Sequence, residues 1–253
     1  MSARRLSPSA RRVRRAARPA KACERAGRAP PVWLFDLDNT LHDASRAVFA
    51  RLDESMTQYI AQELGLSDRE ADHLRREYWR RYGATLLGLV RHHAVDATDF
   101  LHQTHALPGL EAALRAHAHD KAALRALRGR KLVLTNAPAA YARRVLKALD
   151  LWREFDGVLS IEDMRMFGQW RPKPDARMLR GVLVRLGVPA HRCVLVEDTL
   201  AHQKSAHRLG LRTVWMQRWL RGAPHGPEVG IYVHRRPCYV HARIRSLQKL
   251  REL

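Results

Sequence analysis

The chain carries two carboxylates, two residues apart, directly after an apolar run near its start. The run is Val32-Trp33-Leu34-Phe35, and Asp36 and Asp38 follow it. A continuous apolar run is typical of a buried parallel strand, and open parallel sheets bind ligands beyond the carboxyl ends of their strands. Carboxylates this close repel each other unless a cation or a shared proton intervenes, so the pair suits a hard divalent cation such as Mg2+. A strand that ends in a solvated Asx turn is the alternative.

Polar residues also follow two later apolar runs. Thr135 and Asn136 follow the first of these runs, Glu197 and Asp198 follow the second, and Lys173 lies between them along the chain. Taken singly, they are typical of a helix cap, an acid pair at a helix N-terminus and a surface lysine. If the strands are parallel, all five side chains converge on one edge of the sheet, and that constellation predicts a catalytic site.

The converging residues suit phosphoryl transfer. A carboxylate can attack phosphorus to form an acyl phosphate, and Asp36, at the strand end itself, is the predicted nucleophile. Asp38 would protonate the leaving oxygen and later activate water. Thr135, Asn136 and Lys173 are the predicted phosphate-binding residues, which offer polar groups and a positive charge to the non-bridging oxygens.

The predicted cofactor is Mg2+. Asp36, Asp198 and the backbone carbonyl of Asp38 would hold it, with Glu197 as a further candidate ligand. Its charge would offset the repulsion between an anionic nucleophile and a phosphate.

The elements that position these residues alternate between strand and helix. The sequence predicts strands at 32–35, 131–134, 157–160, 192–196 and 212–216 and a short strand at 231–233. Helices are predicted at 109–127, 138–149, 175–186 and 200–209, and a terminal amphipathic helix carries Ile244, Leu247 and Leu250. Such alternation predicts an α/β fold with a parallel sheet and right-handed crossovers.

An all-helical segment interrupts this alternation after the first strand. Apolar spacing predicts helices from 44 to Gly65, from Ser67 to Tyr82, and at 86–93 and 96–105. Ser67 and Glu70 match a capping box. The predicted domains are a tail (1–30), an α/β core (31–43 and 107–253) and a helical insert (44–106). Six histidines in helices are expected to be mostly exposed and to form no second metal site: His92, His93, His102, His105, His117 and His119.

The first 31 residues are strongly basic. They hold ten Lys or Arg residues against one Glu and so contribute +9 of the net charge of +21. Their Arg-, Ala- and Pro-rich composition without apolar periodicity predicts a disordered tail. An organelle transit peptide, an extended start of the reading frame and a nucleic-acid-binding tail are the alternatives. We expect any nucleic-acid partner to bind through this tail alone.

The number of cysteines and the hydropathy of the chain indicate the cellular compartment in which we expect the protein. Cys23, Cys193 and Cys238 form an odd, widely spaced set, which argues against a disulfide framework or a zinc site and favours a reducing compartment. We therefore predict a cytoplasmic protein. No apolar run approaches the ~20 residues of a membrane-spanning helix, so no membrane partner is expected. The sequence does not indicate an oligomeric state.

Four short motifs, in order, resemble those of the haloacid dehalogenase-like hydrolase superfamily: Phe35–Leu41, Leu134–Asn136, Lys173–Asp175 and Val196–Thr199. The match spans about residues 32–216, and the helical insert resembles the family's small α-helical cap. The resemblance implies a Rossmann-like core sandwiched by helices, dependence on Mg2+ and an aspartyl-phosphate intermediate. The true dehalogenases lack an acid at the position of Asp38, so its presence favours phosphatase chemistry.

Two stretches are similar to those of pyrimidine 5′-nucleotidases, namely Asp38–Leu41 and Tyr82–Leu86. The expected activity is therefore the hydrolysis of a small phosphomonoester, first of all a pyrimidine nucleoside 5′-monophosphate. A sugar phosphate or phosphoglycolate is the alternative substrate, and a nucleic-acid-associated protein with a vestigial catalytic fold is the alternative class. His202 departs from the family, where relatives often carry Asn or Gly near that position.

Overall fold

The computed structural model describes residues 30–220 and 236–253. The predicted basic tail apart from Pro30, Cys23 within it, and the short strand expected at 231–233 lie outside these ranges. Within them, no helix combines the length and the apolar character needed to cross a bilayer.

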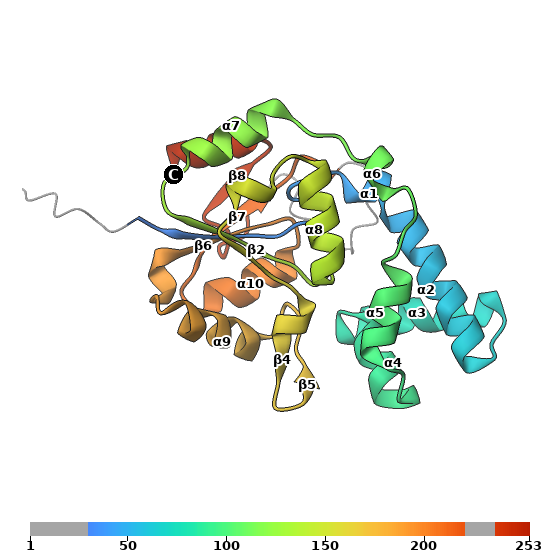
Figure 1. The fold of residues 1–253 in the computed structure, drawn as a ribbon. Coiled ribbons are helices and arrows are strands. Elements are labelled where there is room, and N and C mark those ends of the chain that lie inside the picture. Colours follow the sequence, from blue (N-terminus) through green and yellow to red (C-terminus); the bar gives the residue numbers. More distant parts are fainter. Residues whose placement is uncertain (1–29, 221–235) are drawn as a thin grey trace, which may run out of the picture.

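A six-stranded sheet forms the centre of the protein (Figure 1). Its order is β3-β2-β1-β6-β7-β8, and every neighbouring pair is parallel. The strands are β1 (Val32–Phe35), β2 (Arg130–Leu134), β3 (Gly157–Leu159), β6 (Cys193–Glu197), β7 (Arg212–Met216) and β8 (Ala242–Ile244). The chain adds β2 and β3 on one side of β1 and then β6 and β7 on the other. This reversal at β1 is the topological switch point where open α/β sheets bind ligands.

Helices cover both faces of the sheet. They are α6 (Leu110–Ala113), α7 (Ala118–Ala126), α8 (Ala139–Ala148), α9 (Ala176–Leu186) and α10 (Leu200–Arg208). Trp33 and Phe35 of β1 pack with α7 and α8, whereas Val32 and Leu34 pack with α9 and α10. Figure 1 shows these two helix pairs on opposite sides of the sheet. Burial on both faces explains why β1 is apolar throughout.

The segment between β1 and α6 is helical, as predicted. It contains α1 (Ala44–Ala47), α2 (Phe49–Leu64), α3 (Asp68–Tyr82), α4 (Thr85–His93) and α5 (Ala97–Thr104). Ser67 and Glu70 form the expected capping box, and Gly65 ends α2 in a left-handed conformation, which glycine adopts without steric cost. Helices α2–α5 share their own apolar cluster, which Ile161 and Trp170 join from the α/β part.

Several elements differ from the sequence predictions. The expected terminal helix is wrong: Ile244 ends β8, and Leu247 and Leu250 lie in the 3-10 helix η4 (Leu247–Glu252). These apolar residues are three apart, which matches the three residues per turn of a 3-10 helix. The helix expected at 109–127 is divided into α6 and α7. Unpredicted short elements are β4 (Arg165–Met166) and β5 (Gln169–Trp170), which form a hairpin, and the 3-10 helices η1 (Trp152–Glu154), η2 (Ile161–Met164) and η3 (Ala190–Arg192).

The packing of α4 on α3 depends on Gly88. A Cβ at this position would lie 2.1 Å from Tyr78 Cγ, far inside contact distance. We expect Gly88→Ala to lower the free energy of unfolding by about 1–3 kcal/mol, because the two helices must separate. The control is Gly181→Ala in α9, where Met166 Cε lies 3.5 Å away and alanine should stabilise the helix by about 0.5–1 kcal/mol. Denaturant unfolding measures both variants, and equal stabilities would contradict this account of the contact.

Candidate active site

Three neighbouring strands, β2, β1 and β6, deliver the predicted residues to one edge of the sheet. Asp36 follows β1, Thr135 follows β2, and Glu197 ends β6. Sheet pairing extends to these positions: the Asp36 N–H donates to the Val196 carbonyl, and the Thr135 N–H to the Leu159 carbonyl, both at 2.9 Å. The sheet therefore fixes the backbone of the predicted nucleophile.

Lys173 reaches this edge from the loop before α9 and is 2% exposed. Its Nζ donates to Asp36 Oδ1 at 2.6 Å and to Glu197 Oε2 at 2.8 Å. Asn136 holds the lysine backbone: its Nδ2 donates to the Lys173 carbonyl at 3.0 Å, and its Oδ1 accepts from the Lys173 N–H at 2.8 Å. Asn136 therefore acts on the lysine loop in this structure, a contact that the sequence did not predict.

Thr135 lies beside this loop with its side chain almost fully buried. Its Oγ1 accepts from the Ala137 N–H at 3.0 Å. Because a threonine hydroxyl can donate one hydrogen bond while it accepts others, this contact leaves its O–H free to donate.

At this edge of the sheet, negatively charged side chains outnumber the positively charged lysine. Burial and the charge of Glu197 raise the pKa of Asp36 to about 7, although Lys173 opposes this shift. Burial, Glu197 and Asp36 raise the pKa of Asp198 well above its ordinary value. Burial alone would raise the pKa of Glu197, but the Lys173 ammonium lowers it below its ordinary value. One ammonium thus faces three carboxylates, and their mutual repulsion is only partly offset.

These three carboxylates fit a divalent cation. Asp36, Glu197 and Asp198 each offer an oxygen within 4.8 Å of the others. Carboxylate oxygens are the ligands that Mg2+ prefers, and a dication would relieve the repulsion that raises the pKa of Asp36 and of Asp198. The Asp38 carboxylate lies outside this group, so Asp38 stays a predicted ligand only through its backbone carbonyl.

The side chain of Asp38 belongs to a separate hydrogen-bonded cluster. Its Oδ1 accepts from the Tyr141 hydroxyl at 2.7 Å and lies 2.9 Å from His42 Nε2. Burial would raise the pKa of Asp38, but the contacts with His42 and Tyr141 lower it below its ordinary value. Asn39 stabilises the turn that carries Asp38, because its side chain accepts from the Ser45 N–H at 3.0 Å. Its φ is 56°, a conformation that asparagine tolerates better than most residues.

The structure adds residues that the sequence did not assign to the site. His42 stands four positions after Asp38, a spacing that could have indicated the contact, whereas Tyr141 comes 103 positions later and carries no such signal. His105 was expected to be exposed, and this is wrong: it is buried against Tyr141, with ring centroids 5.6 Å apart, and burial lowers its pKa to about 4. His202 Nδ1 lies 3.1 Å from Glu197 Oε2. The other five histidines are exposed as predicted.

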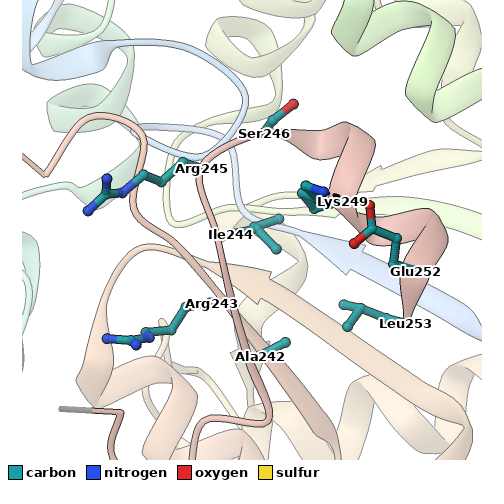
Figure 2. A pocket seen from close by; sticks show the side chains of 8 residues that line it. All are labelled: Ala242, Arg243, Ile244, Arg245, Ser246, Lys249, Glu252 and Leu253. Atoms are coloured by element: carbon teal, nitrogen blue, oxygen red, sulfur yellow. Dashed lines mark hydrogen bonds and ion pairs between the residues drawn. The ribbon is translucent and has the colours of Figure 1, made fainter. Parts of the chain in front are cut away.

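A pocket elsewhere, between β8 and η4, does not share this chemistry (Figure 2). Arg243 and Arg245 point to one side of the strand, away from Ala242 and Ile244. Its only carboxylate side chain, that of Glu252, pairs with Lys249. It offers no group of acids comparable to that at the strand ends.

A protein-family model matches most of the described chain, and this match shows the family to which the chain belongs. The model of the haloacid dehalogenase-like hydrolase family matches residues 32–210, from β1 to the end of α10, and so includes the four acids at the strand ends, Asp36, Asp38, Glu197 and Asp198. The chain belongs to this family. The superfamily resemblance of the four motifs is thereby confirmed, and the α/β fold with a parallel sheet is the fold of its members.

Particular relatives of this haloacid dehalogenase-like hydrolase extend the comparison. "Phosphate metabolism protein 8" of Saccharomyces cerevisiae is 26% identical over 193 residues, 71% of this chain and 59% of the yeast protein. The chain thus spans about three fifths of that relative. A phosphatase of the family from Thermococcus onnurineus shares the fold with a TM-score of 0.58, 21% identity and coverage of 88% of this chain and 96% of the other. CbbY from Rhodobacter sphaeroides, solved in complex with phosphate, shares the fold with a TM-score of 0.57 and 21% identity. The match covers 87% of this chain and 96% of CbbY.

Proposed function

We propose that this chain is a Mg2+-dependent phosphatase of small phosphomonoesters and acts through an aspartyl phosphate on Asp36. The observation that carries the proposal is the set of groups around this residue: Lys173 Nζ lies 2.6 Å from it, two more carboxylates fit a cation beside it, and a second acid, Asp38, follows two residues later. The name of the yeast relative and the phosphate held by CbbY support phosphate chemistry. Asp38 favours a phosphatase over a dehalogenase.

In the first step a carboxylate oxygen of Asp36 attacks phosphorus, and the bond from phosphorus to the ester oxygen breaks. Asp38 delivers a proton to that oxygen, which leaves as an alcohol. In the second step water attacks the phosphorus of the aspartyl phosphate while Asp38 takes up a proton from it. Asp36 is then regenerated, and inorganic phosphate is released.

The proton that Asp38 delivers can arrive with the substrate. The hydrogen bonds on its Oδ1 favour the ionised form before substrate binds. An anionic ester beside the carboxylate raises its pKa, because like charges disfavour ionisation. A phosphomonoester has a second pKa of about 6, so its monoanion can bring the proton that Asp38 passes to the leaving oxygen.

The remaining residues hold the phosphoryl group. Lys173 and the Thr135 hydroxyl bind the non-bridging oxygens, where negative charge lies in the transition state. Asn136 keeps Lys173 in place through the two backbone contacts at 2.8 and 3.0 Å. When bound by Asp36, Asp198 and Glu197, Mg2+ supplies positive charge that lowers the repulsion between nucleophile and phosphate.

We further propose a pyrimidine nucleoside 5′-monophosphate as the substrate and helices α2–α5 as the cap that selects it. The nucleotidase-like stretch at 82–86 lies beside the lysine loop, since a Cβ on Gly83 would be 3.7 Å from Pro174 Cδ. At the start of this stretch, Tyr82 offers an aromatic ring with the Arg81 guanidinium 5.4 Å from its centroid, a combination suited to stacking with a nucleobase. The proposed domains are the cap (44–106) and the α/β core (31–43 and 107–253), and cap closure would exclude water.

A substrate panel tests this proposal. Phosphate release is measured with Mg2+ and UMP, CMP, dTMP, AMP, GMP, phosphoglycolate or sugar phosphates, with Asp36→Asn as the control. We expect the highest kcat/KM on pyrimidine monophosphates. A preference for another ester would discard the nucleotidase assignment and keep the chemistry. No release from any ester would contradict the phosphatase itself and favour a nucleic-acid-associated protein with a vestigial catalytic fold.

Removal of the metal is expected to abolish turnover reversibly. EDTA should bring phosphate release to background, and excess Mg2+ should restore it, because the acids need a dication to accept an anionic substrate. Binding is checked without turnover by thermal unfolding, where Mg2+ at 100 times its Kd adds about 2.7 kcal/mol. Asp198→Asn should weaken this shift. An EDTA-treated protein that keeps its full rate would contradict the metal site.

A further inference from the structure

Tyr141 and His42 both contact the same oxygen of Asp38. The Tyr141 hydroxyl donates to Oδ1 at 2.7 Å, and His42 Nε2 lies 2.9 Å from that atom. No hydrogen bond to Oδ2 occurs in the part of the chain that the structure describes. A carboxylate has two oxygens that can each exchange a proton. Two contacts on one oxygen therefore fix the carboxylate plane and leave the other oxygen free.

Tyr141 is itself rigidly held. It is 2% exposed, lies on α8, and packs in the apolar cluster on one face of the sheet. The ring of His105, just after α5, meets its ring at an angle of 74° with centroids 5.6 Å apart. A buried tyrosine hydroxyl needs a partner, and Asp38 is its hydrogen-bond partner here. The tyrosine thus connects the end of the helical segment to the proposed acid.

We infer that Tyr141 is a positioning residue that holds Oδ1 of Asp38, so that Oδ2 is the atom that gives the proton to the leaving oxygen and later takes one from water. This inference rests on the proposed function. His42 shares the task from the same turn, and His105 keeps the tyrosine ring in place. No new bond is made or broken by Tyr141, whose hydroxyl keeps its own proton.

The role predicts a dependence on the leaving group. An alkoxide, such as the 5′-oxygen of UMP, is a poor leaving group and needs a proton as it departs, whereas p-nitrophenolate leaves without one. The kcat/KM value reports the steps up to the first irreversible one, which includes loss of this group. A residue that acts through the acid should therefore matter for UMP and hardly for p-nitrophenyl phosphate.

The test compares Tyr141→Phe with wild type on these two esters. We expect kcat/KM to fall about tenfold on UMP, part of the about 10²–10⁴-fold that a general acid supplies, and less than about twofold on p-nitrophenyl phosphate. Asp38→Asn should show the same selectivity with a larger loss on UMP. Adding Tyr141→Phe to Asp38→Asn should cost nothing more, since the two residues act as a unit.

Tyr59→Phe is the matched control. Its hydroxyl donates to Asp99 Oδ2 at 2.8 Å in the helical segment, so the variant loses a like hydrogen bond away from the site. It should keep both rates. An equal loss on both esters in Tyr141→Phe, or no loss on either, would overturn the inference. Wild-type protein inactive on both esters would instead contradict the proposed function, so the two failures are distinct.

Discussion

Asp36→Asn is expected to lose about 10⁴-fold or more of its phosphate release while it stays folded. The amide has nearly the shape of the carboxylate but cannot attack phosphorus, and removal of a nucleophile has effects of this size in other enzymes that form covalent intermediates. The pKa of Asp36 is raised to about 7, chiefly by burial and Glu197, so the neutral amide relieves repulsion in the folded state. Thermal unfolding should therefore give a Tm equal to or above that of wild type.

The matched control is Asp99→Asn, an exchange of the same chemistry in α5. Asp99 accepts from Tyr59 and Gln103, both in the helical segment, and none of its hydrogen bonds joins it to a described site residue, so turnover should be unchanged. A rate in Asp36→Asn within tenfold of wild type would refute the nucleophile. A large fall in Tm would show instead that the variant fails through folding.

Lys173→Met is expected to damage both stability and activity. It leaves Asp36 and Glu197 buried without the ammonium that contacts them at 2.6 and 2.8 Å. Removal of one partner from a buried ion pair costs about 3–5 kcal/mol, which corresponds to roughly 6–20 °C in Tm for a chain of this size. Turnover should fall about 10²–10³-fold, because a positive charge aimed at the transition state is lost.

The stability loss should depend on pH. Without Lys173 the folded-state pKa of Asp36 rises further above its ordinary value of 3.8. A carboxyl with a raised folded-state pKa destabilises the fold increasingly up to the pH of that pKa. Because the pKa of Asp36 is already about 7 in wild type, the deficit that Asp36 adds to the variant begins near pH 7 and levels off above the variant's higher folded-state pKa. Denaturant unfolding should show a smaller deficit at pH 5 than at pH 8.

Two further variants isolate the buried contact. Lys249→Met removes an exposed lysine whose pair with Glu252 leaves side chains 60% and 64% exposed, and such pairs contribute little. The double variant Asp36→Asn/Lys173→Met should recover part of the lost stability, because one unpaired charge has gone with its partner. Equal Tm values for Lys173→Met and Lys249→Met would contradict the buried network.

The central strands β1, β6 and β7 were predictable from the sequence because they are buried on both faces, whereas the edge strand β8, with an exposed Arg243, was not predicted. Apolar runs such as 32–35 end abruptly in polar residues, and the parallel register places those ends side by side. Terminal residues such as Leu247 and Leu250 were mispredicted because apolar residues at a spacing of three fit either an α-helix or a 3-10 helix. The hairpin of β4 and β5 has two-residue strands, which are too short to show an alternating pattern.

The candidate site was predictable in its members and not in its contacts. Asp36 and Glu197 lie at the ends of two neighbouring strands, so both could be predicted as site residues from the sequence. The burial of Lys173 between them depends on a loop path that no local pattern records. The contact of Tyr141 with Asp38 could not be predicted from the sequence either. The two residues are 103 positions apart, and only the packing of α8 on the sheet brings them together.

The most direct test of the central claim is to look for the phosphoryl group on Asp36. A reaction with UMP and Mg2+ is quenched in acid within its first turnovers, and the peptides are analysed by mass spectrometry. We expect a phosphorylated peptide with the modification on Asp36 in wild type and none in Asp36→Asn. With p-nitrophenyl phosphate, whose leaving group needs no proton, Asp38→Asn should hold more of it, because water is poorly activated. Turnover without any phosphorylated Asp36, in wild type and in Asp38→Asn alike, would contradict the account.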